Sequence, residues 1–350
     1  MVMLVCNSLL IVIAALLAVA FLTLLERKLM AIVQLRVGPN VIGLFGLLQP
    51  IADGLKLLTK STILPLASST VLFILSPLAI LFFSLLVWSV MPFGPGLVAS
   101  DLNLGIMFLL ACSSLNVHAV AFAGWSSQSA YALLGSMRSV AQLVSYELVL
   151  SSVILAVLAL TESLNISVIG LSQISSGWYG SNSLLCLLPV YLVSLLAETN
   201  RAPFDLPEAE AELVAGYNIE YGGGAFALFF LAEYSAIIVF SLLGAICFLG
   251  AWGNQTLWVL QAVEEAFKAS LFVMLVIVCR AAYPRYRFDQ LMLLGWKVLL
   301  PFTFGYCVLL FCLLSVWSFD ALKWWFEVLI KGAEMKLFYD AFWSALKTRF

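Results

Sequence analysis

The residues whose types and spacing suggest chemistry are carboxylic acids gathered in one short stretch of an apolar chain. Six acids stand between residues 198 and 220 with one base, Arg201, among them: Glu198, Asp205, Glu208, Glu210, Glu212 and Glu220. Carboxylates crowded at low dielectric repel one another, so some of them hold a proton near neutral pH, as proton transfer requires. The competing interpretation is a solvated loop whose acids cap a helix that begins near Asp205 and Pro207.

Further ionisable residues stand inside hydrophobic stretches. Glu147 and Glu233 have no basic neighbour in the sequence, whereas Glu264 and Glu265 precede Lys268. A charge at the centre of a bilayer costs at least about 2.5–3.5 kcal/mol, so we expect Glu147 and Glu233 to be functional. Glu264 and Lys268 are about one helical turn apart and can neutralise each other, and a structural and a functional role stay equally open for that pair.

A third group interleaves arginines with aromatic residues, in the segment that runs from Arg280 through Tyr283 and Arg285 to Asp289. This mixture suits a pocket for a polar aromatic headgroup, because cationic side chains and aromatic rings both bind the faces of such groups. The alternative is a basic loop at a membrane edge, which needs no ligand.

Metal sites and haem ligation are not expected in this chain. His118 is its only histidine, and its seven cysteines include no pair at the C-x-x-C spacing that iron–sulfur and zinc sites commonly use. We interpret the cysteines as buried apolar residues. The net charge of −2 argues against nucleic acid as a partner. Electrons for a redox reaction must therefore come from partner proteins.

The elements that position these groups are transmembrane helices. Hydrophobic residues make up 63% of the 350 residues and charged residues only 10%, too few charges for a water-exposed surface. Because about 20 mostly apolar residues span a bilayer core as a helix, the sequence predicts an all-α, polytopic membrane protein with about eight transmembrane helices. The expected spans cover residues 2–25, 69–92, 102–123, 140–161, 183–200, 224–249, 257–281 and 298–318.

Basic residues set the expected orientation. They lie in the loops that follow odd-numbered spans and are absent from the loops after the second, fourth and sixth spans. Loops on the cytoplasmic or matrix side carry the excess of lysine and arginine, so we expect Arg36, Arg201 and Arg287 there. After a transmembrane domain of residues 1–318, residues 319–350 mix charges with aromatic residues and are expected to form an amphipathic interfacial tail.

One polar stretch between the first two spans has helical periodicity. Within residues 41–60, Gln49, Asp53, Lys56 and Lys60 form a stripe, while apolar residues occupy the other faces. This pattern predicts an amphipathic helix that lies in the headgroup plane. Its role is either interfacial packing alone or the wall of a path for a lipid-soluble substrate.

Four groups of motifs resemble subunit 1 of NADH:quinone oxidoreductase, respiratory complex I. They are Glu26-Arg-Lys with Gln34-Leu-Arg-Val-Gly-Pro-Asn40 and Gly46-Leu-Leu-Gln-Pro-Ile-Ala-Asp53, then Val140-Ala-Gln with Ser145-Tyr-Glu147, then Ala197-Glu-Thr-Asn-Arg-Ala-Pro-Phe-Asp-Leu-Pro-Glu208 with Tyr217-Asn-Ile-Glu-Tyr221 and Ala232-Glu-Tyr234, and finally Ala282-Tyr-Pro-Arg-Tyr-Arg-Phe-Asp-Gln-Leu-Met292. The resemblance runs in order from residue 20 to residue 305.

The resemblance implies a role in quinone reduction. In this family the subunit forms much of the chamber where ubiquinone, the substrate, meets electrons from an iron–sulfur cluster. It binds lipids and contacts both peripheral-arm subunits, which hold the iron–sulfur clusters and FMN, and antiporter-like membrane subunits. By motif position, the expected quinone-binding residues are Glu26, Arg27, Arg36, Asp53, Arg201, Asp205, Arg280 and Arg285. The expected proton-coupling residues are Glu147, Glu198, Glu208, Glu210, Glu212, Glu220 and Glu233. The expected location is the mitochondrial inner membrane, with a bacterial plasma membrane as the alternative.

Two other classes of protein stay open. The membrane subunit of an energy-converting hydrogenase is related and would come with nickel-containing partners. An ion-coupled secondary transporter would use the buried glutamates and Lys268 as ion ligands, although the sequence lacks matched broken helices. The chain departs from the family at Ser61-Thr62, where an acid is usual, and in a longer tail beyond residue 320, for which no family role is expected.

Overall fold

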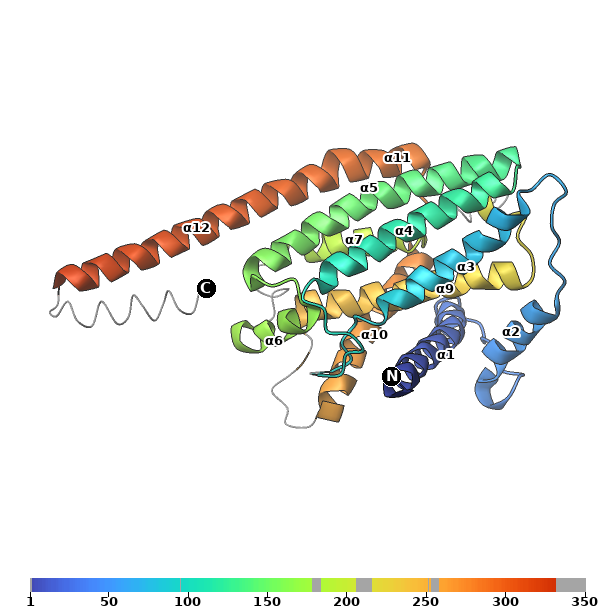
Figure 1. The fold of residues 1–350 in the computed structure, drawn as a ribbon, viewed down its shortest axis with the longest axis horizontal. Helices are drawn as coiled ribbons and strands as arrows, with labels where there is room; N and C mark the ends of the chain where they lie inside the picture. The colour runs from blue at the N-terminus through green and yellow to red at the C-terminus, as the bar shows by residue number, and fades with distance from the viewer. Residues whose placement is uncertain are drawn as a thin grey trace. The chain divides into compact units, whose positions relative to one another are not determined.

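The computed structural model describes residues 2–94, 96–177, 184–205, 216–250, 252 and 258–331. In these ranges every regular element is helical (Figure 1), which confirms the all-α prediction. The chain divides into two compact units, Met1–Thr303 and Phe304–Phe350. The residues of the candidate site all belong to the first unit.

Long apolar helices dominate the described ranges. Six stretches there have the length and hydropathy to cross a membrane: Ser8–Val33, Thr70–Val87, Gly105–Ser126, Ala130–Thr161, Gly224–Leu249 and Phe288–Ser315. They belong to α1 (Val2–Val33), α3 (Thr70–Val87), α4 (Gly105–Ser126), α5 (Ala130–Thr161), α9 (Gly224–Gly244) with the π-helical turn η3 (Ala245–Leu249), and α11 (Phe288–Leu293) with η4 (Leu294–Leu299) and α12 (Leu300–Lys331). The polytopic membrane architecture is thereby confirmed.

Two of the eight predicted spans differ from the expectation. The fifth, predicted for residues 183–200, contains only α7 (Leu188–Glu198) among its described residues. At 1.5 Å per residue this helix is about 16 Å long, less than a hydrocarbon core of about 30 Å. Pro189 sets its start, because proline is accepted in the first turn of a helix but not further inside. The seventh, α10 (Trp258–Ala282), is long enough but carries four charged residues: Glu264, Glu265, Lys268 and Arg280.

The predicted amphipathic helix over residues 41–60 also begins later than expected. The chain first makes a 3-10 turn, η1 (Leu44–Gly46), and α2 then runs from Gln49 to Thr59 without a buried residue. Gly46 has a φ of 78°, and a Cβ there would lie 2.3 Å from the Pro39 carbonyl oxygen, so only glycine fits. This turn interrupts the helical periodicity, and the helix resumes with Pro50 in its first turn.

The core of the first unit lies between α3, α4, α5 and α9, with α7 packed on α5 and α1 packed on α9 and α10. Figure 1 shows α3, α4 and α5 running side by side. The 3-10 turn η2 (Gly216–Asn218) docks closely on α5, where a Cβ on Gly135 would lie 2.5 Å from the Gly216 Cα. Small residues permit such close approach, and this one places the buried Tyr217 in the core. The short α6 (Ile166–Ser176) follows α5.

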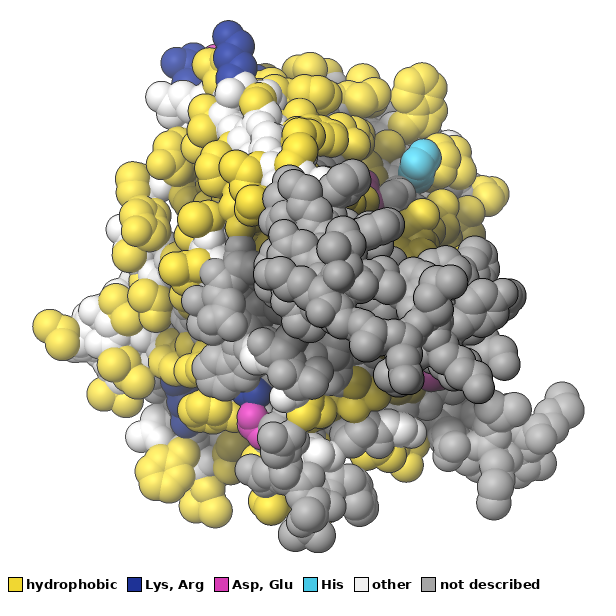
Figure 2. All heavy atoms as spheres, turned by 90° about the vertical axis from the view of Figure 1, so that its left-hand side faces the viewer, with side chains coloured by type: hydrophobic (Ala, Val, Ile, Leu, Met, Phe, Trp, Pro, Cys, Tyr) yellow, Lys and Arg dark blue, Asp and Glu magenta, His cyan; other side chains and the backbone are white. Residues whose placement is uncertain are grey.

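The outer surface is apolar, as a surface in contact with lipid must be. Large hydrophobic side chains lie mostly exposed along several helices, among them Leu10, Ile32, Val71, Val263 and Phe267. The described part of the face in Figure 2 is covered mainly by hydrophobic side chains, with few charged ones. In water such a surface would aggregate, whereas in a bilayer it needs no cover.

Candidate functional site

A buried carboxylate, Glu26 on α1, gathers three side chains from other parts of the chain. The guanidinium of Arg201, from the loop after α7, lies 3.1 Å from Glu26 Oε1, and Arg280 of α10 donates to the same oxygen. The Tyr234 hydroxyl, from α9, donates to Oε2 at 2.5 Å. These four residues, the arginine cluster, thus join four separate elements, and Glu26 itself is only 6% exposed.

The arginine cluster carries one more positive than negative charge. Its two guanidiniums face a single carboxylate, and Arg201 also lies over the Tyr234 ring at 4.3 Å. Burial alone lowers the pKa of Arg201, but Tyr234 and Glu26 raise that pKa above its ordinary value, so the group stays charged. Among the described residues, Arg201 Nε and Nη2 have no hydrogen-bond partner although both atoms are buried.

An open pocket of about 790 Å³ adjoins the arginine cluster. Glu26, Tyr234 and Arg280 line it, together with Arg27, Arg36 and residues 37–41. Its volume falls within the range of about 300–1,000 Å³ that is usual for small-molecule sites. Of the predicted quinone-binding residues, four therefore border one pocket: Glu26, Arg27, Arg36 and Arg280.

Asp53 links the amphipathic helix to this pocket. Its carboxylate lies 2.6 Å from the Arg27 guanidinium of α1 and accepts a hydrogen bond of 3.0 Å from Gln49, on its own helix α2. Arg27 and Asp53 are both partly exposed, so their attraction contributes little to stability. The pair does fix where α2 lies against α1.

The remaining two predicted quinone-binding residues form a second pair. Arg285 Nη2 lies 3.2 Å from the buried Asp205 carboxylate. The same two loops are joined by Phe204 and Tyr286, whose rings stack at 5.6 Å, and by a hydrogen bond from the Tyr286 amide to the Pro203 carbonyl. The arginine-rich segment therefore splits, because Arg280 reaches Glu26 while Arg285 reaches Asp205.

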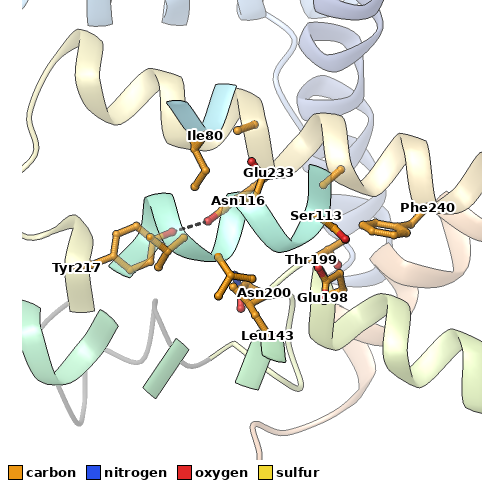
Figure 3. Close-up of a pocket in the computed structure, with 14 residues that line it drawn as sticks. Ile80, Ser113, Asn116, Leu143, Glu198, Thr199, Asn200, Tyr217, Glu233 and Phe240 are labelled. Carbon is orange, nitrogen blue, oxygen red and sulfur yellow. Dashed lines mark hydrogen bonds between the residues drawn. The ribbon is translucent and has the colours of Figure 1, made fainter. Parts of the chain in front are cut away.

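A small cavity of about 60 Å³ lies between helices of the bundle (Figure 3). Glu198 of α7 and Glu233 of α9 line it, together with Ser113 and Asn116 of α4. The Tyr217 hydroxyl donates to Glu233 Oε1 at 3.1 Å, the contact drawn as a dashed line. We call this space the carboxyl cavity.

Glu147 of α5 adds a third carboxyl group beside the carboxyl cavity. The hydroxyls of Ser113 and Ser114 donate to its Oε1 at 2.9 Å and 2.6 Å. Ser113 lines the cavity, and Glu147 is close enough to Glu198 for their charges to interact. Three of the predicted proton-coupling residues thus gather within one region of the bundle.

The carboxyl cavity presents polar atoms that lack partners in the described part of the chain. They are Glu198 Oε2, Asn116 Oδ1 and Asn200 Oδ1, all buried. A water molecule occupies roughly 30 Å³ of liquid volume and needs two to four polar partners, so this cavity suits a small number of waters. Waters between carboxyl groups can carry protons from one group to the next.

The two regions share the elements that form them. Glu198 lines the carboxyl cavity, and Arg201, three residues later, belongs to the arginine cluster. On α9, Glu233 lines the cavity and its neighbour Tyr234 belongs to the cluster. Adjacent residues point about 100° apart around a helix, so one helix can serve both regions.

The other predicted acids have different positions. Glu220 is half-buried and forms no hydrogen bond or ion pair with another described residue. Glu208, Glu210 and Glu212 lie outside the described residues, as does the predicted helix start at Pro207.

Sequence reasoning did not single out several residues of the site. Tyr217, Asn116 and Asn200 at the cavity are ordinary residues in apolar or motif segments, and no local pattern distinguishes them. Ser113 and Ser114 form a polar pair inside a span, which was an available signal.

Of the three charged residues early in α10, Glu264 and Lys268 form an ion pair, while Glu265 accepts a hydrogen bond from a neutral indole. Lys268 Nζ lies 2.7 Å from Glu264 and donates to the Gly250 carbonyl, while the Trp252 indole donates to Glu265 at 2.9 Å. The ion pair explains how Glu264 and Lys268 are accepted in this helix, as the structural interpretation expects.

Comparisons with known proteins agree with these observations. Residues 6–311 match the family model described as NADH dehydrogenase. The chain is 51% identical over 298 residues to NADH-ubiquinone oxidoreductase chain 1 of Arabidopsis thaliana, covering 84% of this chain and 91% of the relative. It is 48% identical over 308 residues to the chain 1 protein of Chondrus crispus, covering 86% and 93%. To a bacterial relative, an NADH-quinone oxidoreductase subunit of Paramagnetospirillum magneticum, it is 48% identical over 303 residues, covering 85% and 88%. The chain therefore belongs to the NADH dehydrogenase family.

Proposed function

We propose that the chain is a core membrane subunit of a proton-pumping NADH:quinone oxidoreductase and that the open pocket is part of its quinone chamber. The relatives named as subunits of that enzyme support the first part. The second part rests chiefly on one observation: three members of the arginine cluster, Glu26, Tyr234 and Arg280, line a pocket of ligand size together with Arg27 and Arg36.

The pocket suits the chemistry of a quinone. A quinone has an apolar tail and a ring with two carbonyl oxygens, which gain negative charge when electrons arrive. Cationic donors at fixed positions stabilise such charge. Here Arg280, which is held by Glu26, lines the pocket together with Arg27 and Arg36. The exposed apolar residues of α1 and α2 offer a surface for the tail.

The chain itself supplies no redox group in this proposal. Iron–sulfur clusters and FMN belong to peripheral-arm partner subunits, which deliver electrons to ubiquinone, the substrate. The apolar outer surface fits contacts with lipid and with antiporter-like membrane partners. The protein is a multi-pass protein of the mitochondrial inner membrane or of the bacterial plasma membrane, because its relatives come from mitochondria and from bacteria.

The carboxyl cavity would then begin the proton-coupling path. Its support is the convergence of Glu147, Glu198 and Glu233 around a space that suits water. We include Glu208, Glu210, Glu212 and Glu220 in this path on the strength of the motif alone. Glu198 is three residues from Arg201, and Glu233 is adjacent to Tyr234. A change of charge at the quinone would therefore change the electrostatic potential at these acids.

The quinone chamber can be tested with two exposed arginines. Arg36 lines the pocket, whereas Arg287 is 75% exposed and lies near Asp289 instead. In the assembled complex, Arg36→Ala should lower kcat/KM for quinone about tenfold, equivalent to about 1.4 kcal/mol. Arg287→Ala is the matched control and should leave it unchanged. Electron transfer from NADH to a soluble acceptor such as ferricyanide, which bypasses this subunit, should be normal in both variants.

The result that would overturn the chamber assignment is equally direct. If Arg36→Ala reduced both activities equally, the defect would lie in assembly. If a photoreactive quinone labelled only residues away from the open pocket, the pocket would not be the chamber.

A further inference from the structure

A buried glutamine on α5 holds the segment that connects the two candidate regions. Gln142 is 0% exposed. Its Nε2 amide donates to the Ala197 carbonyl at 2.8 Å and to the Phe204 carbonyl at 2.7 Å. A side-chain amide has two N–H donors, so both bonds can form at once. One side chain thus spans the two ends of the segment Ala197–Phe204.

This segment begins with a turn that ends α7. The Arg201 amide donates to the Leu196 carbonyl and the Asn200 amide donates to the Ala197 carbonyl. Asn200 has a φ of 48°. These bonds and the left-handed residue define a Schellman motif, in which asparagine is the usual alternative to glycine. The backbone of the turn is therefore fixed locally, and Gln142 binds it to α5.

The turn directs one residue to each region. Glu198 lines the carboxyl cavity, and Arg201 contacts Glu26 in the arginine cluster. At the far end of the segment, Phe204 stacks on Tyr286 and its neighbour Asp205 pairs with Arg285. A displacement at the Phe204 end, beside the quinone chamber, can be passed to Glu198 when both ends of the segment are held by the same side chain on α5.

We propose that Gln142 is the positioning residue that couples the quinone chamber to the carboxyl cavity, by holding both ends of the segment Ala197–Phe204 on α5. This inference rests on the proposed function of the two regions. Without the amide, the Phe204 carbonyl loses this donor, and the chamber loop can shift while Glu198 stays in place. Quinone reduction then continues, but the movement that accompanies it reaches the acids of the carboxyl cavity less well.

A second glutamine provides a matched control. Gln173 of α6 is 2% exposed, and its Nε2 donates to the Ile246 and Cys247 carbonyls at 2.6 Å and 3.2 Å. Like Gln142 it is buried and donates to two backbone carbonyls, but these belong to the π-helical turn η3 and not to the segment between the two regions. A loss of stability alone should be similar at both positions.

The test compares Gln142→Met with Gln173→Met in the complete complex reconstituted in sealed vesicles. Methionine has the length of glutamine without its donors. For Gln142→Met we expect the number of protons translocated per electron to fall severalfold, because both hydrogen bonds that hold the segment on α5 are lost. Quinone turnover per assembled complex should persist. Gln173→Met should keep the parental ratio of protons to electrons.

Equal ratios in the two variants would overturn the proposal, as would a parental ratio in Gln142→Met. If Gln142→Met does not assemble, Gln142→Glu retains one donor as the neutral acid and is measured in its place. Failure of both Gln142 variants to assemble would show a purely structural residue. Glu198→Gln separates the two hypotheses: if it pumps normally, the carboxyl cavity is not the proton path, whereas loss of pumping there with normal pumping in Gln142→Met refutes only the coupling role.

Discussion

At the scale of single residues, Glu26 is the least replaceable member of the arginine cluster, because its one buried carboxylate contacts both guanidiniums. Removing its charge takes an anionic partner away from both Arg201 and Arg280. Breaking a buried ion pair on one side typically costs about 3–5 kcal/mol. We expect Glu26→Gln to reduce the amount of assembled complex on a native gel. Tyr234→Phe removes only one hydrogen bond to Glu26 and should assemble normally with a raised KM for quinone. Normal assembly of Glu26→Gln would show that other groups balance the arginines.

The acids of the carboxyl cavity should affect proton transfer and leave assembly intact. Glu147 accepts hydrogen bonds from the Ser113 and Ser114 hydroxyls, and Glu233 accepts one from the Tyr217 hydroxyl. The amide oxygen of a glutamine can accept the same hydrogen bonds at either position. We expect Glu147→Gln and Glu233→Gln to depress quinone-linked proton translocation by about tenfold or more, as loss of a proton-transfer group does. Proton uptake by vesicles is the measurement.

An exposed acid at the far end of α5 serves as the control for these substitutions. Glu162 follows the last residue of α5 and lies outside the cavity. Glu162→Gln should pump at the parental rate. Full pumping at normal turnover in both cavity variants would leave Glu147 and Glu233 with a structural role only.

The identity of these residues was predictable from the sequence, but their grouping was not. Ionisable residues in apolar stretches are costly, and this alone singles out Glu147 and Glu233. Glu26 meets Arg201 and Arg280 across 175 and 254 residues of chain. Such meetings depend on which helices pack together, and hydropathy does not encode that. The amide oxygens of Asn116 and Asn200, which lack partners among the described residues, are likewise visible only in the fold.

At the scale of elements, the turn after α7 makes a distinct prediction. Asn200 occupies the left-handed position of the Schellman motif with a φ of 48°. Asn200→Gly keeps this backbone available, whereas Asn200→Val strains it by about 1–2 kcal/mol. We expect Asn200→Val to lower the thermal stability of the complex, measured by loss of quinone reductase activity on heating. Asn200→Gly should be close to the parent, and equal loss in both would mean that the asparagine side chain matters more than its backbone.

The sequence predicted helices well where apolar composition alone decides them. The predicted helix boundaries were wrong where local backbone chemistry decides the start of a helix. The η1 turn delays α2 to Gln49, since Gly46 leaves no space for a side chain, and Pro189 delays α7. In α10, Glu264, Glu265 and Lys268 bind nearby side chains, so a helix of spanning length accepts more charged residues than a hydropathy criterion allows. The expected boundary at residue 318 between membrane domain and tail stays a prediction.

At the scale of the molecule, the length of α5 can be compared with the thickness of the membrane. Near one end of α5, Asn165 Nδ2, just beyond the helix, donates to Asp101 at 2.8 Å. Toward the other end, the Arg138 guanidinium lies over the Phe288 ring at 5.7 Å, next to Arg287. Between Arg138 and the end of α5 at Thr161 the helix rises about 35 Å, enough to cross a hydrocarbon core of about 30 Å. Asp101 and Arg287 therefore stand at opposite ends of a membrane-crossing helix.

This geometry and the charge rule lead to the same topology. Basic residues concentrate in the loops on the Arg287 side, which should face the cytoplasm or matrix. We expect cysteines introduced as Asp101→Cys and Arg287→Cys to react with a membrane-impermeant maleimide from opposite sides of sealed vesicles. Both positions are exposed, so the helix bundle itself does not hide either thiol. The parent complex measures background labelling, because its exposed Cys186 and Cys312 can also react. Labelling of both introduced cysteines from one side would show that α5 does not cross the membrane, and the cavity between α4, α5 and α9 would then lose its place in a transmembrane proton path.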